Sequence, residues 1–371
     1  MAFQVEGIEV RDELAGQLLD KLFDWTNQER AEWMADLSVM ANYKFDHYEG
    51  FSVGERFFER LARWLVQFEN ADDRRRLVDF VRGELVFISR DEMNQAILGA
   101  YPHHIKPILI RQAAEALSLP QHRLAAITGS PEFGEIRRKT LFLGLSDGAR
   151  LDQLRRSSSE LSHEQFSLSA ELGDYAKQSM VEKLAAALVS QGATGSAAVF
   201  QHIVLVDDFY GSGTSLIDQR EDNQWKGKLV RAKNHLADLA SAEPPVVVRE
   251  PTVTVLLYVA SHQAKAHIRG LLGRYQPTWN LVIIQELPDS LRVSDPHLRR
   301  ICDDFFDPVM EDEHKGAAPH GYKDASLPVV LFHNTPNNSI SPLWSDTENV
   351  PGSKDRRALF PRYERHHADR P

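Results

Sequence analysis

The sequence has a single cysteine, Cys302, among 371 residues, and it lacks any long apolar run. One thiol excludes an intrachain disulfide framework and a zinc site built from several cysteines. No stretch approaches the roughly 18 uncharged apolar residues of a transmembrane helix. The first residues, MAFQVEGIEVRDEL, contain acids and no apolar core, so we expect no signal peptide there. These absences predict a cytoplasmic protein with no membrane partner.

An excess of positive charge is also lacking. The formal net charge is -10, which excludes a whole-protein attraction to nucleic acid and leaves room only for a local basic patch. Hydrophobic residues make up 42% of the chain and charged residues 26%, the composition of an ordinary folded protein. The length favours about two domains.

The first part of the chain has the pattern of α-helices. Apolar residues recur at helical spacing between Phe57 and Phe68, and Asn70 or Asp72 can cap the helix that follows. Ser89 with Glu92 fits a capping box, and 105–117 continues the amphipathic pattern. No alternating strand pattern occurs before about residue 138. We therefore expect residues 1–128 to form an α-helical N-terminal domain.

The pattern then changes to short apolar runs separated by helical stretches. Ser162 with Gln165 can start one such helix, and another covers His262–Leu272 and stops at Gly273. This alternation is typical of a mainly parallel sheet flanked by helices, an α/β fold. We place this domain at 129–350, followed by a basic, His-rich extension at 351–371. The apolar runs are TLFLGL at 140–145, IVLV at 203–206, TVTVLLYVA at 252–260, LVII at 281–284 and VVLF at 329–332.

The most informative segment is IVLVDDFYGSGTS at 203–215. In open α/β sheets, ligands bind beyond the carboxyl ends of the strands, where Asp207 and Asp208 stand. The small residues that follow offer backbone N–H groups, and a turn that leads into a helix forms a nest for an anion. Carboxylates beside such a nest suit a ligand that carries hydroxyls and a phosphate. A ribose 5-phosphate has both.

An apolar strand, two acids and a small-residue loop resemble the phosphoribosyl-pyrophosphate signature of type I phosphoribosyltransferases. The resemblance implies a type I phosphoribosyltransferase-like α/β fold and a phosphoribosyl pyrophosphate or nucleotide ligand, with Mg²⁺ as cofactor. Asp208 and Asp207 would contact the ribose 2′ and 3′ hydroxyls. The loop would hold the 5′-phosphate, at Gly211, Ser212, Gly213, Thr214 and Ser215.

The same resemblance implies a second loop, which binds pyrophosphate. LFLGLSDGAR at 141–150 has the expected order of strand, glycine-containing loop and helix. The loop would bind through backbone N–H groups, with Arg150 as a counter-charge. Asp147 departs from this scheme, because a carboxylate repels pyrophosphate unless Mg²⁺ or an arginine lies between them. The loop consists of Ser146, Asp147, Gly148, Ala149 and Arg150.

The turn HNTPNNS at 333–339, with Pro342 and Trp344 after it, resembles a branch of phosphoribosyltransferase-like proteins from bacterial conflict loci, some of them associated with retrons. That resemblance implies an anti-phage role and a defence partner protein or a nucleic-acid complex. Asn334, Asn337 and Asn338 could read a base or another acceptor beside the sheet. A structural turn, in which they bond their own backbone, explains them equally well.

Two other classes of protein fit parts of the sequence. The pattern GLSDG at 144–148 also fits the nucleophile elbow of a serine hydrolase, with Ser146 as nucleophile and Asp307 and His333 as its partners. This alternative leaves Asp207 and Asp208 unexplained. The second alternative is a nucleotide sensor without catalysis, in which the helical domain contacts a partner. The sequence favours transfer or cleavage at the ribose anomeric carbon.

Overall fold

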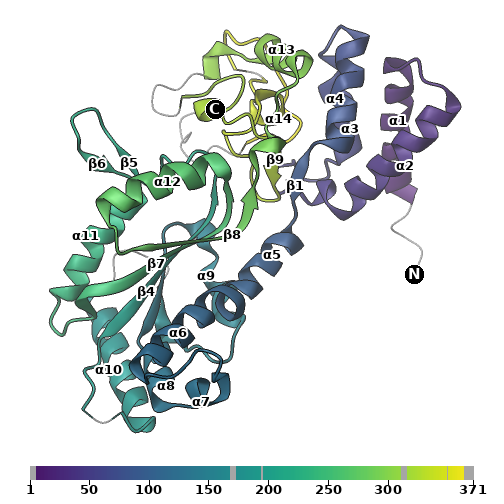
Figure 1. Ribbon diagram of the computed structural model, residues 1–371. Helices are drawn as coiled ribbons and strands as arrows, with labels where there is room; N and C mark the ends of the chain where they lie inside the picture. The colour runs from purple at the N-terminus through teal and green to yellow at the C-terminus, as the bar shows by residue number, and fades with distance from the viewer. Residues whose placement is uncertain (1–5, 168–172, 194, 311–315, 349, 363–371) are drawn as a thin grey trace. The chain divides into compact units, whose positions relative to one another are not determined.

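The computed structural model describes residues 6–167, 173–193, 195–310, 316–348 and 350–362, with side chains from Leu14 onward. The chain divides into two compact units, shown in Figure 1. Unit 1 combines residues 1–92 with 288–371, and unit 2 is the continuous stretch 93–287. This division by compactness falls at other points than the domain limits expected from the sequence, which remain predictions.

Unit 2 is built on a parallel sheet of five strands in the order β3-β2-β4-β7-β8. Apolar side chains fill the central strands on both faces, which is why these runs read as continuous in the sequence. The fold class expected from the sequence is confirmed. The strands are β2 (Thr140–Gly144), β3 (Phe166–Ser167), β4 (Phe200–Tyr210), β7 (Val247–Ser261) and β8 (Asn280–Leu287).

Three helices share one hydrophobic core with one face of the sheet: α10 (Asp174–Ser190), α11 (Lys228–Ala240) and α12 (His262–Tyr275). The strand residues in that core include Ile203 and Leu205. Alternate residues such as Val204 and Val206 are buried on the opposite face. The other elements of unit 2 are the end of α5 (Arg90–Gly99), the π-helix η2 (Ala100–Ile105), α6 (Lys106–Ala116), α7 (Leu124–Thr128), α8 (Pro131–Arg138), η3 (Asp147–Ala149), α9 (Leu151–Arg156), η4 (His163–Gln165) and a hairpin of β5 (Asp218–Gln219) and β6 (Trp225–Lys226).

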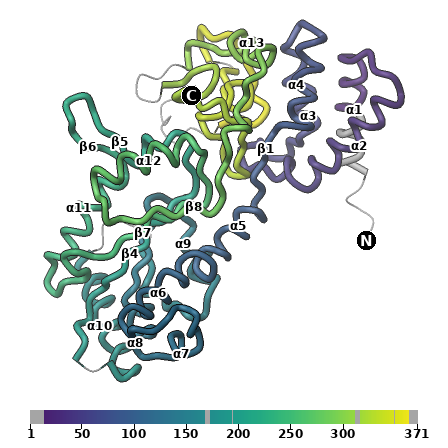
Figure 2. Tube along the Cα trace, viewed as in Figure 1, coloured from purple at the N-terminus to yellow at the C-terminus, as the bar shows by residue number. Residues whose placement is uncertain are grey.

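Unit 1 joins the two ends of the described chain, and in Figure 2 the purple N-terminal helices and the yellow C-terminal segment both belong to it. Strand β1 (Val86–Ile88) pairs in parallel with β9 (Val329–Leu331). The ring of Phe360 stacks on Phe57 and packs at steeper angles against Phe45 and Phe87. The other elements are α1 (Glu6–Leu22), α2 (Asn27–Tyr43), η1 (Phe45–His47), α3 (Phe57–Val66), α4 (Ala71–Gly83), η5 (Asp289–Leu291), α13 (Pro296–Phe305), η6 (Pro308–Met310), η7 (Tyr322–Asp324) and α14 (Ser341–Trp344).

The local helix signals were mostly right. Asn70 caps α4, and Ser89 and Glu92 exchange both hydrogen bonds of a capping box. The capping box of Ser162 and Gln165 is present too, but it caps the short η4 and not a long helix, which was wrong. The predicted stop at Gly273 is also wrong, because α12 continues to Tyr275. A glycine within a helix costs about 1 kcal/mol and does not by itself end it.

The strand assignments need two corrections. The run at 329–332 was expected in the main sheet, but β9 forms a separate two-stranded sheet with β1. Strand β1 lies in the part of the chain where no strand was expected. The fifth strand of the main sheet is β3, which pairs with β2 through Phe142 and Phe166. Both missed strands are too short, at three and two residues, to show a period in sequence.

Two further expectations concern the membrane and the C-terminal extension. Within the described residues, no helix combines the length and apolar character that a membrane span requires. In the extension, Ala358, Leu359 and Phe360 are buried, and the Phe360 N–H donates to the Leu343 carbonyl at 2.8 Å. Residues 363–371 lie outside the described part of the chain.

Candidate functional site

The loops after β2 and β4 meet at one point of the sheet edge. The two strands are neighbours, with Gly144 beside Val206, while β3 lies on the far side of β2 and β7 on the far side of β4. The chain therefore leaves the two strands in opposite directions. In an open parallel sheet, this reversal opens a crevice at the carboxyl ends of the strands, where ligands bind. Both loops predicted from the sequence stand at this switch point.

Asp207 is the most enclosed polar residue of the site, with 0% of its surface exposed. Its Oδ1 accepts a hydrogen bond from the Ser146 hydroxyl of the β2 loop. Its Oδ2 accepts one from the Tyr210 hydroxyl and one from Lys228 Nζ at 2.6 Å. Burial, and then the charge of Asp207, raise the pKa of Tyr210 well above its usual value, so its phenol stays a donor. Three donors and one positive charge thus offset the cost of burying this carboxylate.

Asp208 lies on the other face of the strand. Strand β4 continues to Tyr210, so both acids belong to the strand rather than to the loop after it, and successive side chains of a strand point to opposite faces. Asp208 is half-buried, and its Oδ1 accepts the N–H of Phe209 at 2.8 Å. Its Oδ2 lies so close to Gly148 that any β-carbon at that position would collide with it. The Asp208 carboxylate therefore packs directly against the backbone of the β2 loop.

The small-residue loop after β4 has the features of an anion nest. Gly211, Ser212 and Gly213 are buried, and Thr214 and Ser215 are progressively more exposed. Gly213 has φ +82°, and a β-carbon there would also strike Ile268 of α12. Within the described chain, the N–H groups of Ser212, Gly213 and Thr214 donate to no protein acceptor. These donors are suited to the oxygens of a phosphate.

The expected helix does not follow this loop directly, which corrects the sequence interpretation. The polar stretch at 218–228 forms the β5–β6 hairpin, and α11 begins only at Lys228. The helix nevertheless starts beside the loop, because the Lys228 N–H donates to the Ser215 carbonyl at 3.0 Å. The N–H of Leu229 donates to the Leu216 carbonyl at 2.9 Å. The first N–H groups of α11 are thus bonded to carbonyls at and after the end of the loop, so they are not directed at an anion.

The β2 loop uses part of its backbone internally. The N–H groups of Ala149 and Arg150 donate to Ser146 and Asp147 carbonyls within η3. The Ala149 carbonyl accepts the Tyr258 hydroxyl of β7 at 2.8 Å, and burial raises the pKa of that phenol far above its usual value. Arg150 has φ +46°. The predicted pyrophosphate cradle therefore has fewer backbone donors than expected, with Ser146, Asp147 and Gly148 as its remaining N–H groups. Asp147 itself is exposed.

The serine hydrolase alternative finds no support in these contacts. The Ser146 hydroxyl donates to Asp207, a carboxylate, where a nucleophilic serine would donate to a base such as histidine. Asp307 and His333 belong to unit 1. There, Asp307 is buried and bonds Thr347 and two backbone N–H groups, those of Val309 and Lys354.

The asparagine turn also belongs to unit 1, and it acts within that unit. The Asn334 side chain accepts the N–H of Thr335 at 2.9 Å, and Asn338 Nδ2 donates to the Tyr322 carbonyl at 3.2 Å. The Asn337 carbonyl accepts the Tyr322 N–H at 2.7 Å. Because β9 is not part of the main sheet, the reason for placing this turn at the ligand edge is removed. The side chains of Asn334 and Asn338 thus bond backbone groups of unit 1, whereas the Asn337 contact is made by its backbone. Recognition of a base by these three residues stays a prediction.

A metal site made only of protein groups is not found in the described chain, where no three His, Cys, Asp or Glu residues gather. In the two loops and the strand end at the switch point, the carboxylates that are not fully buried are Asp208 and Asp147. Mg²⁺ keeps several waters and often binds through one or two carboxylates plus phosphate oxygens. These residues therefore fit an ion that is carried largely by a phosphorylated ligand.

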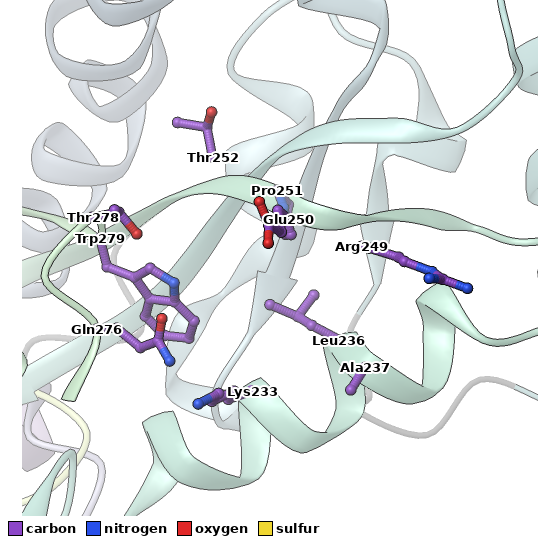
Figure 3. A pocket seen from close by; sticks show the side chains of 10 residues that line it. All are labelled: Lys233, Leu236, Ala237, Arg249, Glu250, Pro251, Thr252, Gln276, Thr278 and Trp279. Carbon is purple, nitrogen blue, oxygen red and sulfur yellow. The ribbon is translucent and has the colours of Figure 1, made fainter.

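A hollow of about 590 Å³ lies at the opposite end of the sheet from the two loops. It is lined by the first residues of β7, by α11 and by the turn before β8. Figure 3 shows the Trp279 ring and the Leu236 side chain directed into it. Arg249 and Thr252 stand at the amino end of β7, whereas the ligand edge of a parallel sheet is the carboxyl one. The hollow is thus separate from the switch point.

Sequence reasoning missed three residues of the site: Tyr210, Lys228 and Tyr258. Tyr210 stood within the motif at 203–215, but its hydroxyl could not be paired with Asp207 without knowing how the strand ends. Lys228 follows a hairpin of unpredictable geometry. Tyr258 lies in an apolar run at 252–260, where a buried phenol hydroxyl requires a hydrogen-bond partner. That requirement was the one available signal.

A family model described as PRTase-CE matches residues 61–362, most of the chain, including both loops of the switch point. Neither the search of curated proteins nor the search of solved structures returned a match.

Proposed function

Because the chain belongs to the PRTase-CE family, which is phosphoribosyltransferase-like, we propose that its switch point binds a ribose 5-phosphate ligand, either phosphoribosyl pyrophosphate or a nucleotide. The observation that carries this proposal is the junction of the two loops, where Ser146 bonds Asp207 and Gly148 packs on Asp208. The loop at 211–215 takes the 5′-phosphate, and the acidic strand end takes the ribose hydroxyls. The loop at 146–150 takes the pyrophosphate of phosphoribosyl pyrophosphate.

The reaction we propose is transfer or cleavage at the ribose anomeric carbon. The bond from that carbon to the departing pyrophosphate or base breaks, and the electron pair leaves with the departing group. An oxocarbenium-like ribose remains for the acceptor or for water. The chain supplies the position of the ribose and the donors that stabilise the departing charge. Mg²⁺, carried on the phosphate oxygens, would neutralise part of that charge.

The test is binding and turnover by the wild type and by Asp208→Asn. Calorimetry with phosphoribosyl pyrophosphate, with and without Mg²⁺, is expected to give saturable binding that weakens at least about tenfold in the variant, a loss of 1.4 kcal/mol or more. Mass spectrometry of reactions with phosphoribosyl pyrophosphate or nucleotides is expected to detect pyrophosphate or free base. The matched control is Glu221→Gln in the exposed hairpin, which should bind like the wild type. Unchanged binding by Asp208→Asn would contradict the assignment.

The same measurement separates an enzyme from a sensor. Saturable binding with no product over a long incubation supports a nucleotide sensor, for which unit 1 is the candidate contact surface for a partner. We propose the enzyme, acting on a nucleotide pool as an effector of anti-phage defence. This role is supported by the resemblance of the turn at 333–339 to proteins of conflict loci. We expect expression of the wild type to arrest cell growth and expression of Asp208→Asn to leave growth unaffected.

A further inference from the structure

Asp207 is placed to join structural elements rather than to meet a ligand. Its side chain is fully buried, and its three donors come from the β2 loop, from β4 itself and from the first residue of α11. Oδ2 already receives both Tyr210 and Lys228. A carboxylate oxygen offers about two lone-pair directions, so Oδ2 has none left for a ribose hydroxyl. A ribose hydroxyl could bind Asp207 Oδ2 only by displacing Lys228 or Tyr210.

Lys228 is equally committed. Its side chain is 23% exposed, its Nζ lies 2.6 Å from Asp207 Oδ2, and the same nitrogen lies 5.5 Å from the centre of the Tyr210 ring. Its backbone N–H donates to the carbonyl of Ser215, the last residue of the loop at 211–215, which we call the phosphate loop. One residue thus ties the end of that loop to the buried acid. Displacing its ammonium would leave a buried carboxylate without its counter-charge, which is strongly unfavourable.

The direction of the two acids leads to the same division. Asp207 follows Ile203 and Leu205 on the face that packs on α10, α11 and α12. Asp208 follows Val204 and Val206 on the other face, where it meets Gly148 of the β2 loop. Both acids contact the β2 loop, Asp207 through the Ser146 hydroxyl and Asp208 against the backbone of Gly148, but Asp207 is fully buried and Asp208 is not. The acid with exposed surface for a ligand is therefore Asp208.

We propose that Asp207 and Lys228 are a pair of positioning residues, a charge clamp that fixes the phosphate loop at 211–215 relative to the β2 loop at 146–150. In this arrangement Asp208 is the acid that contacts the ribose diol. The clamp rests on the proposed function, since it assigns roles within the same site. It predicts that the charges of Asp207 and Lys228 are needed only for each other. Removing both together is then tolerated better than removing either one.

The experiment is a double-mutant cycle with Asp207→Asn, Lys228→Met and their combination, beside Asp208→Asn. Each protein is measured for its unfolding midpoint and for its Kd for phosphoribosyl pyrophosphate with Mg²⁺. Each single clamp variant is expected to lower the midpoint and to raise Kd at least about tenfold. The combination is expected to lose less of its midpoint and less of its affinity than the two single variants together, because it leaves no buried charge without a partner. Asp208→Asn is expected to keep the midpoint and lose binding.

The outcomes separate the clamp from the proposed function. If the combination recovers its midpoint but binds as poorly as Asp207→Asn, Asp207 contacts the ligand and the clamp is wrong, while the proposed function stands. If Asp208→Asn and the combination both bind like the wild type, the ribose assignment fails. A wild type that does not bind overturns both.

Lys228 gives a second test that does not depend on the folding of the combination. If Asp207 were the ligand-contacting acid, Lys228→Met would uncover it and keep the affinity. The clamp requires Lys228→Met to weaken binding and Lys228→Arg, which keeps the charge, to restore it. A folded Lys228→Met protein with wild-type Kd would overturn the clamp.

Discussion

At the scale of single residues, Gly148 shows how closely the β2 loop approaches the end of β4 at the switch point. Its missing side chain is the space that the Asp208 carboxylate occupies. The Asp208 side chain cannot easily move away, because its backbone belongs to β4, the central strand of the sheet. Any side chain at this position must therefore move the β2 loop, and that movement changes the site without touching the ligand itself.

We predict that Gly148→Ala raises the Kd for phosphoribosyl pyrophosphate at least about tenfold, measured by calorimetry. The matched control is Gly270→Ala in α12, where a β-carbon meets no atom within 4 Å. That variant should keep its affinity and gain roughly 0.5–1 kcal/mol of stability, because alanine is the better helix residue. Equal effects of the two substitutions on Kd would contradict the close packing of Gly148 on Asp208.

His202, near the start of β4, gives the protein a pH response that is unrelated to the ligand site. Burial, and secondarily the charge of Lys139, lower the pKa of His202 to about 4 from its usual 6.5. The unfolded chain binds this proton more readily than the folded chain. Stability from His202 is therefore present above pH 6.5 and is lost as the pH falls toward 4, by at most about 3 kcal/mol.

The corresponding prediction is that His202→Gln flattens this part of the stability profile. Urea unfolding at pH 7 and pH 5 should show a smaller difference in the variant than in the wild type. The other titrating groups are common to both proteins, so they cancel in the comparison. A difference between the two pH values that is the same in both proteins would show that His202 is not held neutral by the fold.

At the scale of elements, Ser261 joins the end of β7 to the phosphate loop. Its hydroxyl oxygen accepts the Ala264 N–H at 3.0 Å as the N-cap of α12, and it donates to the Gly211 carbonyl at 2.5 Å. Ser130 has the same two tasks at α8, with Phe133 N–H at 3.1 Å and the Ile127 carbonyl at 2.8 Å. The two caps are chemically matched, but only the first bears on the ligand edge.

We predict that Ser261→Ala and Ser130→Ala each lower the free energy of unfolding by about 1–2 kcal/mol, measured in denaturant. Only Ser261→Ala is expected to weaken binding, because the Gly211 carbonyl then loses its donor and the loop loses its fixed shape. Should Ser130→Ala weaken binding as much, the effect would belong to general stability rather than to the phosphate loop.

Elements also mark how far sequence reasoning reached. The strands that end at Gly144 and Tyr210 were predictable, since long apolar runs leave few alternatives for burial. The pairing partner of VVLF at 329–332 was not, because an apolar run shows that it is buried and not which strand lies beside it. The hairpin after Ile217 was likewise unpredictable as a pair of two-residue strands. The site followed the same rule: motif residues could be named, but Lys228 needed the fold.

At the scale of the whole molecule, unit 1 is held together by contacts between residues 286 to 313 positions apart in sequence. Arg60 of α3 is buried, donates to the Ala358 carbonyl at 2.7 Å, and pairs with Asp346 and with Glu55. The Tyr48 hydroxyl donates to the Pro361 carbonyl at 2.7 Å. Unit 2, in contrast, is one continuous stretch of the sequence, and none of these contacts lies within it.

We predict that Arg60→Ala destabilises unit 1 by about 3 kcal/mol, because it leaves Asp346 and Glu55 without their buried cation. Calorimetric unfolding should show a lowered transition for unit 1, while the stabilisation of unit 2 by ligand is unchanged. Arg63→Ala breaks the exposed pair with Glu59 and a longer contact of 3.9 Å with Glu55, and it should cost less than about 1 kcal/mol because Arg60 still pairs with Glu55. Loss of ligand affinity in a folded Arg60→Ala protein would show that the units are not energetically separate.

The pairing of β1 with β9 also sets an order of events during synthesis. Residues 86–88 leave the ribosome long before 329–331, and at about 5–20 residues per second the delay is roughly ten to fifty seconds. In that interval the continuous stretch 93–287 emerges complete, whereas helices α1 to α4 and strand β1 wait for β9. All residues of the proposed ligand site therefore leave the ribosome before β9 is synthesised. Any activity that requires unit 1 is then confined to chains that have been translated nearly to their end.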